Sequence, residues 1–354
     1  MSGQDVSGQV CAEPVREDES VWLDFLWLEL TNRCNLQCVH CYTDSHPQSG
    51  HRDLLSKDHY DKVMTDAYAL GCRKVQLIGG EPQLSPHFGH LLARAEEIGY
   101  EFVEVFSNLT HLADETVDFA AEHDVAFATS VYSHDPAVHD RVTKVRSSHE
   151  RTVRNLRRLL ERGVTVRAAV IAIDQGQEEI GRTKDFLNGM GVDSVRVGDI
   201  REFGRAQDVM SQDAQLSGLC GHCWRGRLCV SPDGTAYACV MAREWPVGNV
   251  LEEDLAQILR GGPLDRMRQT IREEVWVPRA QAHAERSKTC APSKPGEPGP
   301  YCAPDLGPCG PGDCPQGGDP TPACVPDGCP QSCEPDTCPQ SCEPNPFCGP
   351  DVEK

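Results

Sequence analysis

Three cysteines, Cys34, Cys38 and Cys41, lie on one short stretch (31–42, the cysteine loop), with three and two residues between them. Cysteine thiolates are the usual protein ligands of iron–sulfur clusters. Three of them leave one iron of a four-iron cluster open, so that a small chelating molecule can bind there. A structural zinc site would normally close with a fourth protein ligand, and a zinc loop that uses His40 in this way is the alternative.

A second group of cysteines follows later in the chain, at Cys220, Cys223, Cys229 and Cys239. Between the last two, Pro232-Asp233-Gly234 separates two short β-type runs and predicts a hairpin. A pair of cysteines with two residues between them, next to a hairpin, also suits a zinc ribbon. That interpretation stays open for this group.

Six short β-type runs alternate with amphipathic helical stretches between residues 26 and 197. This order predicts a parallel sheet with right-handed crossovers, as a curved six-strand sheet or an open barrel. Ligands of such sheets bind at the carboxyl ends of the strands, and the cysteine loop directly follows the first strand. The expected strands are 26–30, 75–79, 102–106, 125–131, 164–173 and 194–197.

Capping signals predict where the helices begin and end. Helix starts are expected at Ser85-Pro86, Asp114 and Ser148. An apolar-periodic helix is expected after the hairpin, over residues 251–259. Helix ends, where a left-handed residue is favoured, are expected at Gly71, Gly99, Gly163 and Gly191.

The composition excludes several classes of partner. The 354 residues carry 34 basic and 54 acidic side chains, a net charge of −20, which argues against a nucleic-acid partner. No apolar run approaches the roughly 20 residues of a membrane span, and the N-terminus contains no apolar signal core. We therefore expect a cytoplasmic protein with no membrane partner. In a reducing compartment, 19 cysteines indicate metal or thiolate chemistry rather than disulfides.

The last 65 residues differ from the rest of the chain. They contain ten of the 19 cysteines and 17 of the 26 prolines, with ten acidic and two basic residues. Almost nothing there could build an apolar core, so this segment is low-complexity sequence. It includes a nine-residue repeat that begins at Cys329 and again at Cys338. We expect the folded part to end near residue 285.

The chain resembles the radical S-adenosylmethionine (SAM) superfamily over about residues 24–200. The resemblance rests on the cysteine loop, with the aromatic-type His40 before its last cysteine, and on Gly79-Gly80-Glu81-Pro82 after the second strand. It implies that a [4Fe–4S] cluster on Cys34, Cys38 and Cys41 binds the amino and carboxylate groups of SAM. Reduction of SAM then produces methionine and a 5′-deoxyadenosyl radical, which abstracts a hydrogen atom from the substrate.

The resemblance also assigns SAM-binding roles at the strand ends. The backbone of Gly79 and Gly80 can approach the SAM ammonium closely, and Glu81 adds a negative charge near it. Asn108 stands where relatives often carry an Asn-Gly turn, although Leu109 replaces the glycine here. The remaining expected SAM contacts are His40, Ser130 at the end of the fourth strand, and a carboxylate-binding arginine at Arg141, with Arg146 and Arg151 as competitors.

The region after residue 204 is similar to the twitch and SPASM extensions of peptide-modifying radical SAM enzymes. In these, a hairpin with a Gly-x4-Cys motif, here Gly234 to Cys239, carries ligands of an auxiliary cluster. This implies one auxiliary [4Fe–4S] cluster on Cys220, Cys223 and Cys239, with Cys229 or a tail cysteine as the fourth ligand. No further Cys-x2-Cys follows Cys223, which favours a single auxiliary cluster; a second auxiliary cluster is the alternative.

Together these features predict an α/β fold: a partial (β/α)6 radical SAM barrel, a hairpin-plus-helix auxiliary-cluster domain and a low-complexity tail. The expected boundaries are 1–21 for an N-terminal extension, 22–203 for the radical SAM core, 204–285 for the auxiliary domain and 286–354 for the Cys/Pro-rich acidic tail.

The resemblance implies a radical SAM enzyme that cross-links, epimerises or oxidises a ribosomally synthesised precursor peptide. The alternative is a dehydrogenase, epimerase or decarboxylase that acts on a sugar or aminocyclitol. Only about 20 residues precede the first strand, too few for the winged precursor-binding domain of some relatives. A separate leader-recognition protein or direct leader binding is therefore expected, with a flavodoxin or ferredoxin as electron donor. The sequence assigns no catalytic acid or base.

Overall fold

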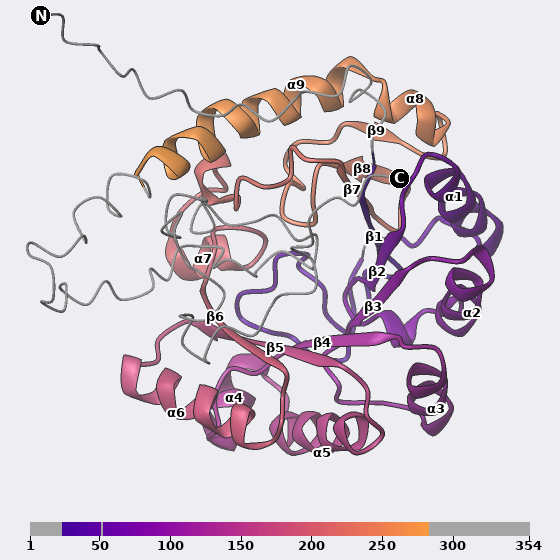
Figure 1. Ribbon diagram of the computed structural model, residues 1–354. Coiled ribbons are helices and arrows are strands. Elements are labelled where there is room, and N and C mark those ends of the chain that lie inside the picture. Colours follow the sequence, from indigo (N-terminus) through magenta and orange to yellow (C-terminus); the bar gives the residue numbers. More distant parts are fainter. Residues whose placement is uncertain (1–22, 51, 283–354) are drawn as a thin grey trace, which may run out of the picture. The chain divides into compact units, whose positions relative to one another are not determined.

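The computed structural model describes residues 23–50 and 52–282 of the chain (Figure 1). These residues belong to one compact unit. The expected N-terminal extension, Cys11 and the Cys/Pro-rich tail with all its cysteines lie outside the described residues. The expected domain boundaries stay predictions.

Nine strands of the described part form one mixed sheet. They are β1 Phe25–Glu29, β2 Lys74–Ile78, β3 Phe102–Phe106, β4 Ala126–Ser130, β5 Val166–Ala172, β6 Ser194–Asp199, β7 Arg227–Val230, β8 Thr235–Tyr237 and β9 Gly248–Asn249. The spatial order is β6-β5-β4-β3-β2-β1-β7-β8-β9. Strands β1 to β6 are parallel, β7 pairs in parallel with β1, and β8 and β9 continue the sheet antiparallel.

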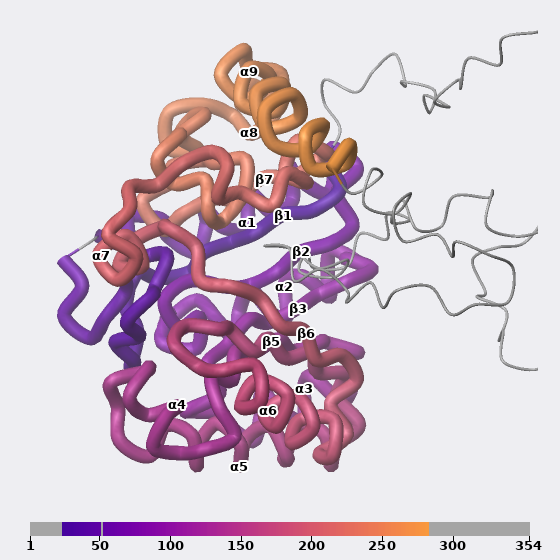
Figure 2. Tube along the Cα trace, turned by 90° about the vertical axis from the view of Figure 1, so that its left-hand side faces the viewer, coloured from indigo at the N-terminus to yellow at the C-terminus, as the bar shows by residue number. Residues whose placement is uncertain are grey.

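The described helices are α1 Lys57–Ala69, α2 Phe88–Ile98, α3 Asp114–Glu122, α4 Pro136–Thr143, α5 Ser148–Glu161, α6 Gln177–Gly189, α7 Ala206–Met210, α8 Leu255–Leu259 and α9 Gly262–Thr270, with 3-10 turns η2 Pro82–Leu84 and η3 Leu216–Gly218 and a π-helix η4 Ile271–Trp276. Of these, α1 to α6 lie on the outer side of the parallel strands (Figure 1). Figure 2 shows α8 and α9 on the side of the sheet away from α4, α5 and α6. Within the described residues, every helix is too short or too polar to cross a bilayer.

The core explains why the six parallel strands could be expected from the sequence. Parallel strands are covered on both faces, so they are near-continuous apolar runs. All five residues of β1 are buried, and Leu77, Val105 and Phe127 on the following strands belong to the same apolar cluster. The observed strands agree with the expected ones to within one or two residues at each end, and the expected hairpin joins β7 to β8.

The helix ends agree with the expectations better than the helix starts. The four glycines expected to end helices have positive φ angles of 96°, 91°, 74° and 88°. Ser85 follows η2, and α2 begins only at Phe88. Asp114 is the first helical residue of α3 rather than its cap. The helix expected from residue 251 begins only at Leu255. Asp254 is its N-cap residue and has an extended backbone conformation.

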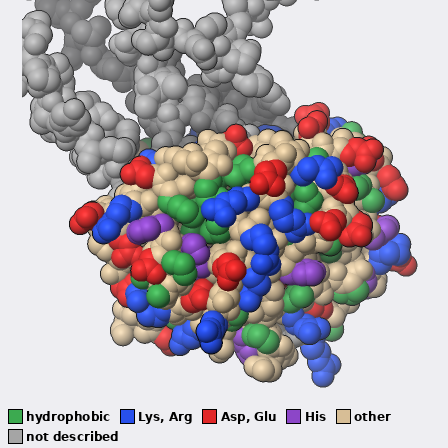
Figure 3. All heavy atoms as spheres, turned by 90° about the horizontal axis from the view of Figure 1, so that it is seen from below, with side chains coloured by type: hydrophobic (Ala, Val, Ile, Leu, Met, Phe, Trp, Pro, Cys, Tyr) green, Lys and Arg blue, Asp and Glu red, His purple; other side chains and the backbone are tan. Residues whose placement is uncertain are grey.

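The outer face of α5 is rich in arginine. Arg158 pairs with Asp114, and Arg162 pairs with Asp118 at 2.5 Å. Figure 3, which views the molecule from the side of α4, α5 and α6, shows cationic side chains interspersed with carboxylates. The basic helix therefore contributes to a surface of mixed charge, and the absence of a nucleic-acid partner stays a prediction.

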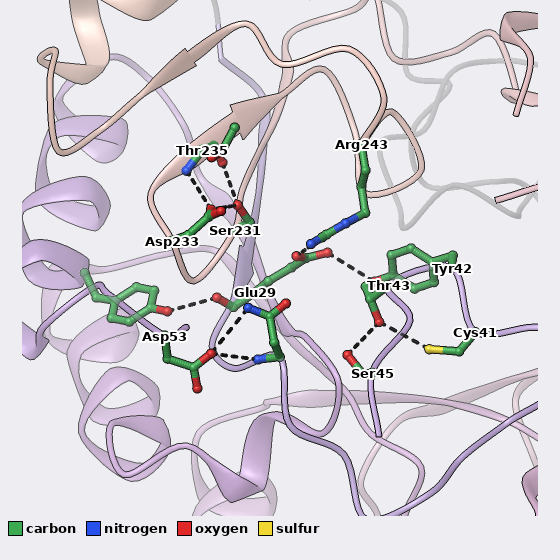
Figure 4. Close-up of polar contacts among 12 residues, drawn as sticks. Glu29, Cys41, Tyr42, Thr43, Ser45, Asp53, Ser231, Asp233, Thr235 and Arg243 are labelled. Atoms are coloured by element: carbon green, nitrogen blue, oxygen red, sulfur yellow. Dashed lines mark hydrogen bonds and ion pairs between the residues drawn. The ribbon is translucent and has the colours of Figure 1, made fainter. Parts of the chain in front are cut away.

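A buried carboxylate joins the cysteine loop to the region after β8. The Glu29 side chain at the end of β1 is 1% exposed and forms an ion pair with Arg243 (Figure 4). The hydroxyl of Tyr42, in the cysteine loop, donates to Glu29 Oε1 at 3.4 Å. From α1, the Tyr60 hydroxyl donates to the backbone carbonyl of Glu29 at 2.9 Å. Three segments distant in the sequence thus meet at one residue.

Replacement of Arg243 tests this joint. In an Arg243→Gln chain the Glu29 carboxylate is left buried without its cation, and we expect the free energy of unfolding to fall by about 3–5 kcal/mol in urea titrations. The double variant Glu29→Gln/Arg243→Gln should recover part of this loss. The matched control is Arg182→Gln, which breaks an exposed pair with Glu178 and should leave stability nearly unchanged. Equal effects of the two single variants would contradict the assignment.

Candidate functional site

The cysteine loop leaves the end of β1 and places its three thiols on one cavity. Cys34 Sγ accepts a hydrogen bond from the backbone of Leu36 at 3.4 Å and lies 3.7 Å from Asn108 Nδ2. Cys41 Sγ lies 3.2 Å from the Thr43 hydroxyl. Burial raises the pKa of Cys34 and raises that of Cys38 to about 12. Without a bound metal, these two thiols therefore hold their protons at neutral pH.

Gly204 and Arg205, just after β6, hold the cysteine loop in shape. The guanidinium of Arg205 donates to the carbonyls of Cys38 at 2.9 Å and Ser45 at 2.8 Å, and pairs with Asp44 at 2.7 Å. Gly204 has a φ angle of 54°, and a Cβ there would overlap the carbonyl oxygen of Cys41. Sequence reasoning missed the role of both residues; the only signal was a Gly-Arg pair a few residues after the end of β6.

His40 and Tyr132 form an aromatic wall beside the thiols. Their ring centroids lie 5.0 Å apart with an edge-on geometry, and the Tyr132 hydroxyl lies 3.8 Å from Cys38 Sγ. Burial lowers the pKa of His40 to about 4, so the imidazole is neutral. Its buried Nδ1 has no hydrogen-bond partner among the described residues. Tyr132 was not expected; it lies two residues beyond Ser130, at the same strand end.

The turn after β2 packs its backbone against the cysteine loop. The amide of Gly80 donates to the Thr31 carbonyl at 2.8 Å, and that of Glu81 donates to the Arg33 carbonyl at 2.9 Å. Gly79 has a φ angle of 145°, and a Cβ on Gly80 would overlap the Arg33 carbonyl oxygen. Both glycines line the cavity. The expected close backbone approach of the two glycines is therefore present, and the backbone that they approach is that of the cysteine loop.

Glu81 lies beneath this turn and outside the set of residues that line the cavity. Its carboxylate accepts hydrogen bonds from the Ser107 hydroxyl at 2.9 Å and from the Asn108 amide at 2.9 Å. Gln83 donates to it from both its backbone and its side chain, each at 3.3 Å. Burial raises the pKa of Glu81 to about 6 despite these donors. The carboxylate therefore connects the ends of β2 and β3, in addition to any role toward a cation.

The structure brings most of the other expected SAM contacts to the cavity, but not Arg141. Asn108 and Ser130 line it. The Arg141 guanidinium lies on the exposed side of α4, where it pairs with Asp174 at 3.2 Å. Neither Arg146 nor Arg151 lines the cavity. The arginines that do so are Arg167, Arg196, Arg201 and Arg227.

Three of the four cysteines of the second group meet at the same cavity. Cys220 Sγ and Cys223 Sγ are 3.8 Å apart, and hydrogen bonds to the thiols of Cys220 and Cys239 raise the pKa of Cys223. Cys229 is fully buried on β7, opposite Trp27 and Tyr237, and does not line the cavity. In residues 23–50 and 52–282, no three His, Cys, Asp or Glu side chains are arranged to hold a single metal ion. Cys72, between α1 and β2, is buried and donates to the Lys74 carbonyl at 3.2 Å.

One cavity of about 300 Å³ connects the two cysteine groups. The residues lining it come from the cysteine loop, from the inner face of the parallel strands and from the segment after β8. Beside the four arginines, its lining carries one carboxylate, that of Asp199. A molecule in this cavity would therefore lie near both thiol groups, in a mainly apolar lining whose charged side chains are mostly arginines.

Two family models match this chain. Residues 28–187 match the radical SAM superfamily, and residues 220–291 match SPASM, an iron–sulfur cluster-binding domain. The first match contains the cysteine loop and the turn after β2. The second begins at Cys220 and contains the hairpin.

Two curated relatives come from Bacillus subtilis (strain 168). The chain is 22% identical over 293 residues to the antilisterial bacteriocin subtilosin biosynthesis protein AlbA. This alignment covers 73% of this chain and 63% of AlbA. The chain is 27% identical over 182 residues to the sporulation killing factor maturation protein SkfB. This alignment covers 51% of this chain and 43% of SkfB. The chain thus spans less than two thirds of either relative.

A solved structure has the same fold. SuiB of Streptococcus suis bound to S-adenosylmethionine aligns with a TM-score of 0.58 at 16% identity, over 72% of this chain and 68% of SuiB. SuiB bound to the precursor peptide SuiA aligns equally well, over 72% of this chain and 67% of SuiB.

The raised pKa of Glu81 predicts an acid-side change in stability. The folded-state pKa of about 6 lies above the ordinary 4.5, so the folded chain binds more protons at Glu81 between these values. This contribution to stability is complete below pH 4.5 and is lost as the pH rises through 6, a change of about 2 kcal/mol. The difference in unfolding free energy between the unaltered chain and Glu81→Gln should shift by this amount across that window. A difference that stays constant with pH, as expected for the exposed Glu101→Gln control, would contradict it.

Proposed function

Because this chain belongs to the radical SAM superfamily and carries a SPASM domain, we propose that it modifies a ribosomally synthesised precursor peptide by cross-linking, epimerisation or oxidation. The observation that carries this proposal is the single cavity lined by both cysteine groups. The names of AlbA and SkfB, as biosynthesis and maturation proteins, and the SuiB complex with a precursor peptide support a peptide substrate.

The donor set fits the cofactors of this superfamily. Cys34, Cys38 and Cys41 would hold a [4Fe–4S] cluster with SAM, and Cys220, Cys223 and Cys239 would hold an auxiliary cluster. The fourth ligand of the auxiliary cluster would be the buried Cys229 on β7 or a cysteine outside the described residues. When bound, the SAM cluster supplies a 5′-deoxyadenosyl radical for hydrogen abstraction.

The protein's own residues give this site its shape. Gly79 and Gly80 leave the backbone bare on the cavity side, and Asn108 and Ser130 provide polar groups at neighbouring strand ends. The neutral His40 and the buried Tyr132 exclude water from the cysteine loop. Among the lining arginines, Arg201 follows the end of β6, on the same side of the sheet as the cysteine loop, and would pair with a carboxylate of SAM or of the peptide.

The partners of this reaction belong to the same proposal. A flavodoxin or ferredoxin would supply electrons, and a separate protein would present the leader of the precursor. The net charge of −20 and the reduced thiols on the cavity support a cytoplasmic location and argue against nucleic acid as substrate.

Replacement of the loop thiols tests the cluster assignment. The intact chain should bind about eight irons, as two four-iron clusters. A Cys34→Ala/Cys38→Ala/Cys41→Ala chain should lose about half of this iron and all formation of 5′-deoxyadenosine, while the auxiliary iron remains. Cys72→Ala, which removes a buried thiol far from the loop in sequence, is the control and should keep both. Continued SAM cleavage by the triple variant would reject the assignment, and about twelve irons would indicate a second auxiliary cluster.

A mass measurement tests the substrate class. We expect a precursor peptide encoded beside the gene to lose two hydrogen masses on cross-linking or oxidation, or to take up solvent deuterium at unchanged mass on epimerisation. The triple cysteine variant serves as the control for enzyme dependence. If SAM is cleaved and only a sugar or aminocyclitol is altered, the peptide assignment is wrong and the small-molecule alternative replaces it.

A further inference from the structure

The end of α4 packs against the backbone of the cysteine loop. The amides of Gln37 and Val39, on either side of Cys38 in the chain, each donate to a carbonyl in the last turn of α4 at 3.0 Å. Residues 144–147, the α4–α5 junction, follow directly after this turn. The junction therefore lies next to the backbone that carries Cys38.

The α4–α5 junction has a fixed backbone shape. Lys144 and Ser147 have φ angles of 57° and 58°, which are uncommon for residues other than glycine. The Asp140 carboxylate holds this shape, because it accepts hydrogen bonds from the amides of Ser147 and His149 and from the Ser148 hydroxyl, the last two at 2.9 Å and 2.8 Å. Such strained backbone persists only where its surroundings determine it, and it is often found at functional sites.

Exposed cations begin at this junction and continue onto α5. Residues 144–154 carry four basic side chains and one acidic one, Glu150, although the whole chain has a net charge of −20. Within residues 23–50 and 52–282, none of the four forms an ion pair, whereas Arg158 and Arg162 farther along α5 do. Arg151 donates to the Arg146 carbonyl at 3.3 Å. We call the four the basic patch: Lys144, Arg146, Arg151 and Arg154.

A line of packed rings connects the first turn of α5 with Cys38. The ring centroids of His149 and His139 lie 5.4 Å apart, and those of His139 and Tyr132 lie 5.2 Å apart. The Tyr132 hydroxyl lies 3.8 Å from Cys38 Sγ. All three aromatic side chains are buried. The path from the basic patch to the thiol thus runs through packed protein, across which an electron tunnels better than across water.

We propose that the basic patch is the docking site of an acidic redox protein, a flavodoxin or ferredoxin, that reduces the cluster on the cysteine loop. This inference rests on the proposed function and assigns its electron donor a place on the chain. In each event the reduced donor loses one electron and the oxidised cluster gains it, and no atom is transferred. Complementary charge steers the encounter and sets the orientation in which the donor faces the loop.

Carbodiimide cross-linking tests the docking site without any change to the chain. The reagent joins a lysine to a carboxylate in direct contact with it, and Lys144 is the lysine of the basic patch. With an acidic bacterial flavodoxin or ferredoxin as the probe, we expect peptide mapping to find Lys144 joined to the donor. Lys57, exposed on α1, should stay free of the donor. A Lys144→Arg chain keeps the charge and should lose the cross-link.

Reduction kinetics test the same site by charge reversal. The full chain with its clusters is mixed with the pre-reduced flavodoxin or ferredoxin in a stopped-flow instrument. At low ionic strength, Lys144→Glu/Arg146→Glu should be reduced about tenfold more slowly than the unaltered chain, because charge steering changes association rates by this order. The difference should become small at about 1 M salt, where the Debye length is about 3 Å.

A second charge reversal provides the matched control. Arg260→Glu/Arg266→Glu changes the net charge equally at exposed positions of the α8 and α9 region, on the side of the sheet away from α4 and α5 (Figure 2). This variant should be reduced at nearly the unaltered rate. Dithionite is a small reductant that needs no docking site. With dithionite, both variants should cleave SAM as the unaltered chain does, which shows that their fold and clusters are intact.

The outcomes separate this inference from the proposed function. Equal reduction of Lys144→Glu/Arg146→Glu and the unaltered chain would overturn the inference, as would cross-links that avoid Lys144. If neither acidic donor reduces the unaltered chain, the inference is overturned as well, even when dithionite supports SAM cleavage. Failure of the unaltered chain to cleave SAM with dithionite would overturn the proposed function itself.

Discussion

The burial of one carboxylate decides how the two halves of this protein meet. Glu29 is 1% exposed at the end of β1, where an unpaired charge would cost several kcal/mol. Its partners come from the cysteine loop through Tyr42 and from the segment after β8 through Arg243. β7 pairs in parallel with β1, so the segments around β7 that carry the second cysteine group lie next to the strand from which the cysteine loop leaves.

The parts of the fold that follow from local patterns could be predicted from the sequence. Apolar runs of the right length identify the parallel strands, and glycines with positive φ angles mark the helix ends. The resemblance to the radical SAM superfamily was likewise confirmed by the family model that matches residues 28–187, which contain the cysteine loop and the Gly79-Gly80 turn. Helix starts were less accurate, since Ser85 serves the turn η2 rather than α2.

The parts of the site that depend on distant contacts could not be predicted. Arg205 contacts a loop more than 160 residues before it, and nothing near it in the sequence indicates that partner. The carboxylate of Glu81 accepts hydrogen bonds from residues at the end of β3. The Gly79-Gly80-Glu81-Pro82 motif alone does not show in which direction this side chain points. Similarly, the net charge of −20 gives no sign of a cavity whose charged lining side chains are mostly arginines.

The absence of a side chain at Gly204 has a consequence for the folding of the chain during its synthesis. The carbonyl of Cys41 occupies the space that a Cβ at 204 would need, so the two segments are complementary only once both are in place. The contacts of Gly204 and Arg205 with the cysteine loop join residues that lie about 160 positions apart in the chain. During synthesis these contacts can form only after about 200 residues have been made, so they are among the late contacts of the cysteine loop.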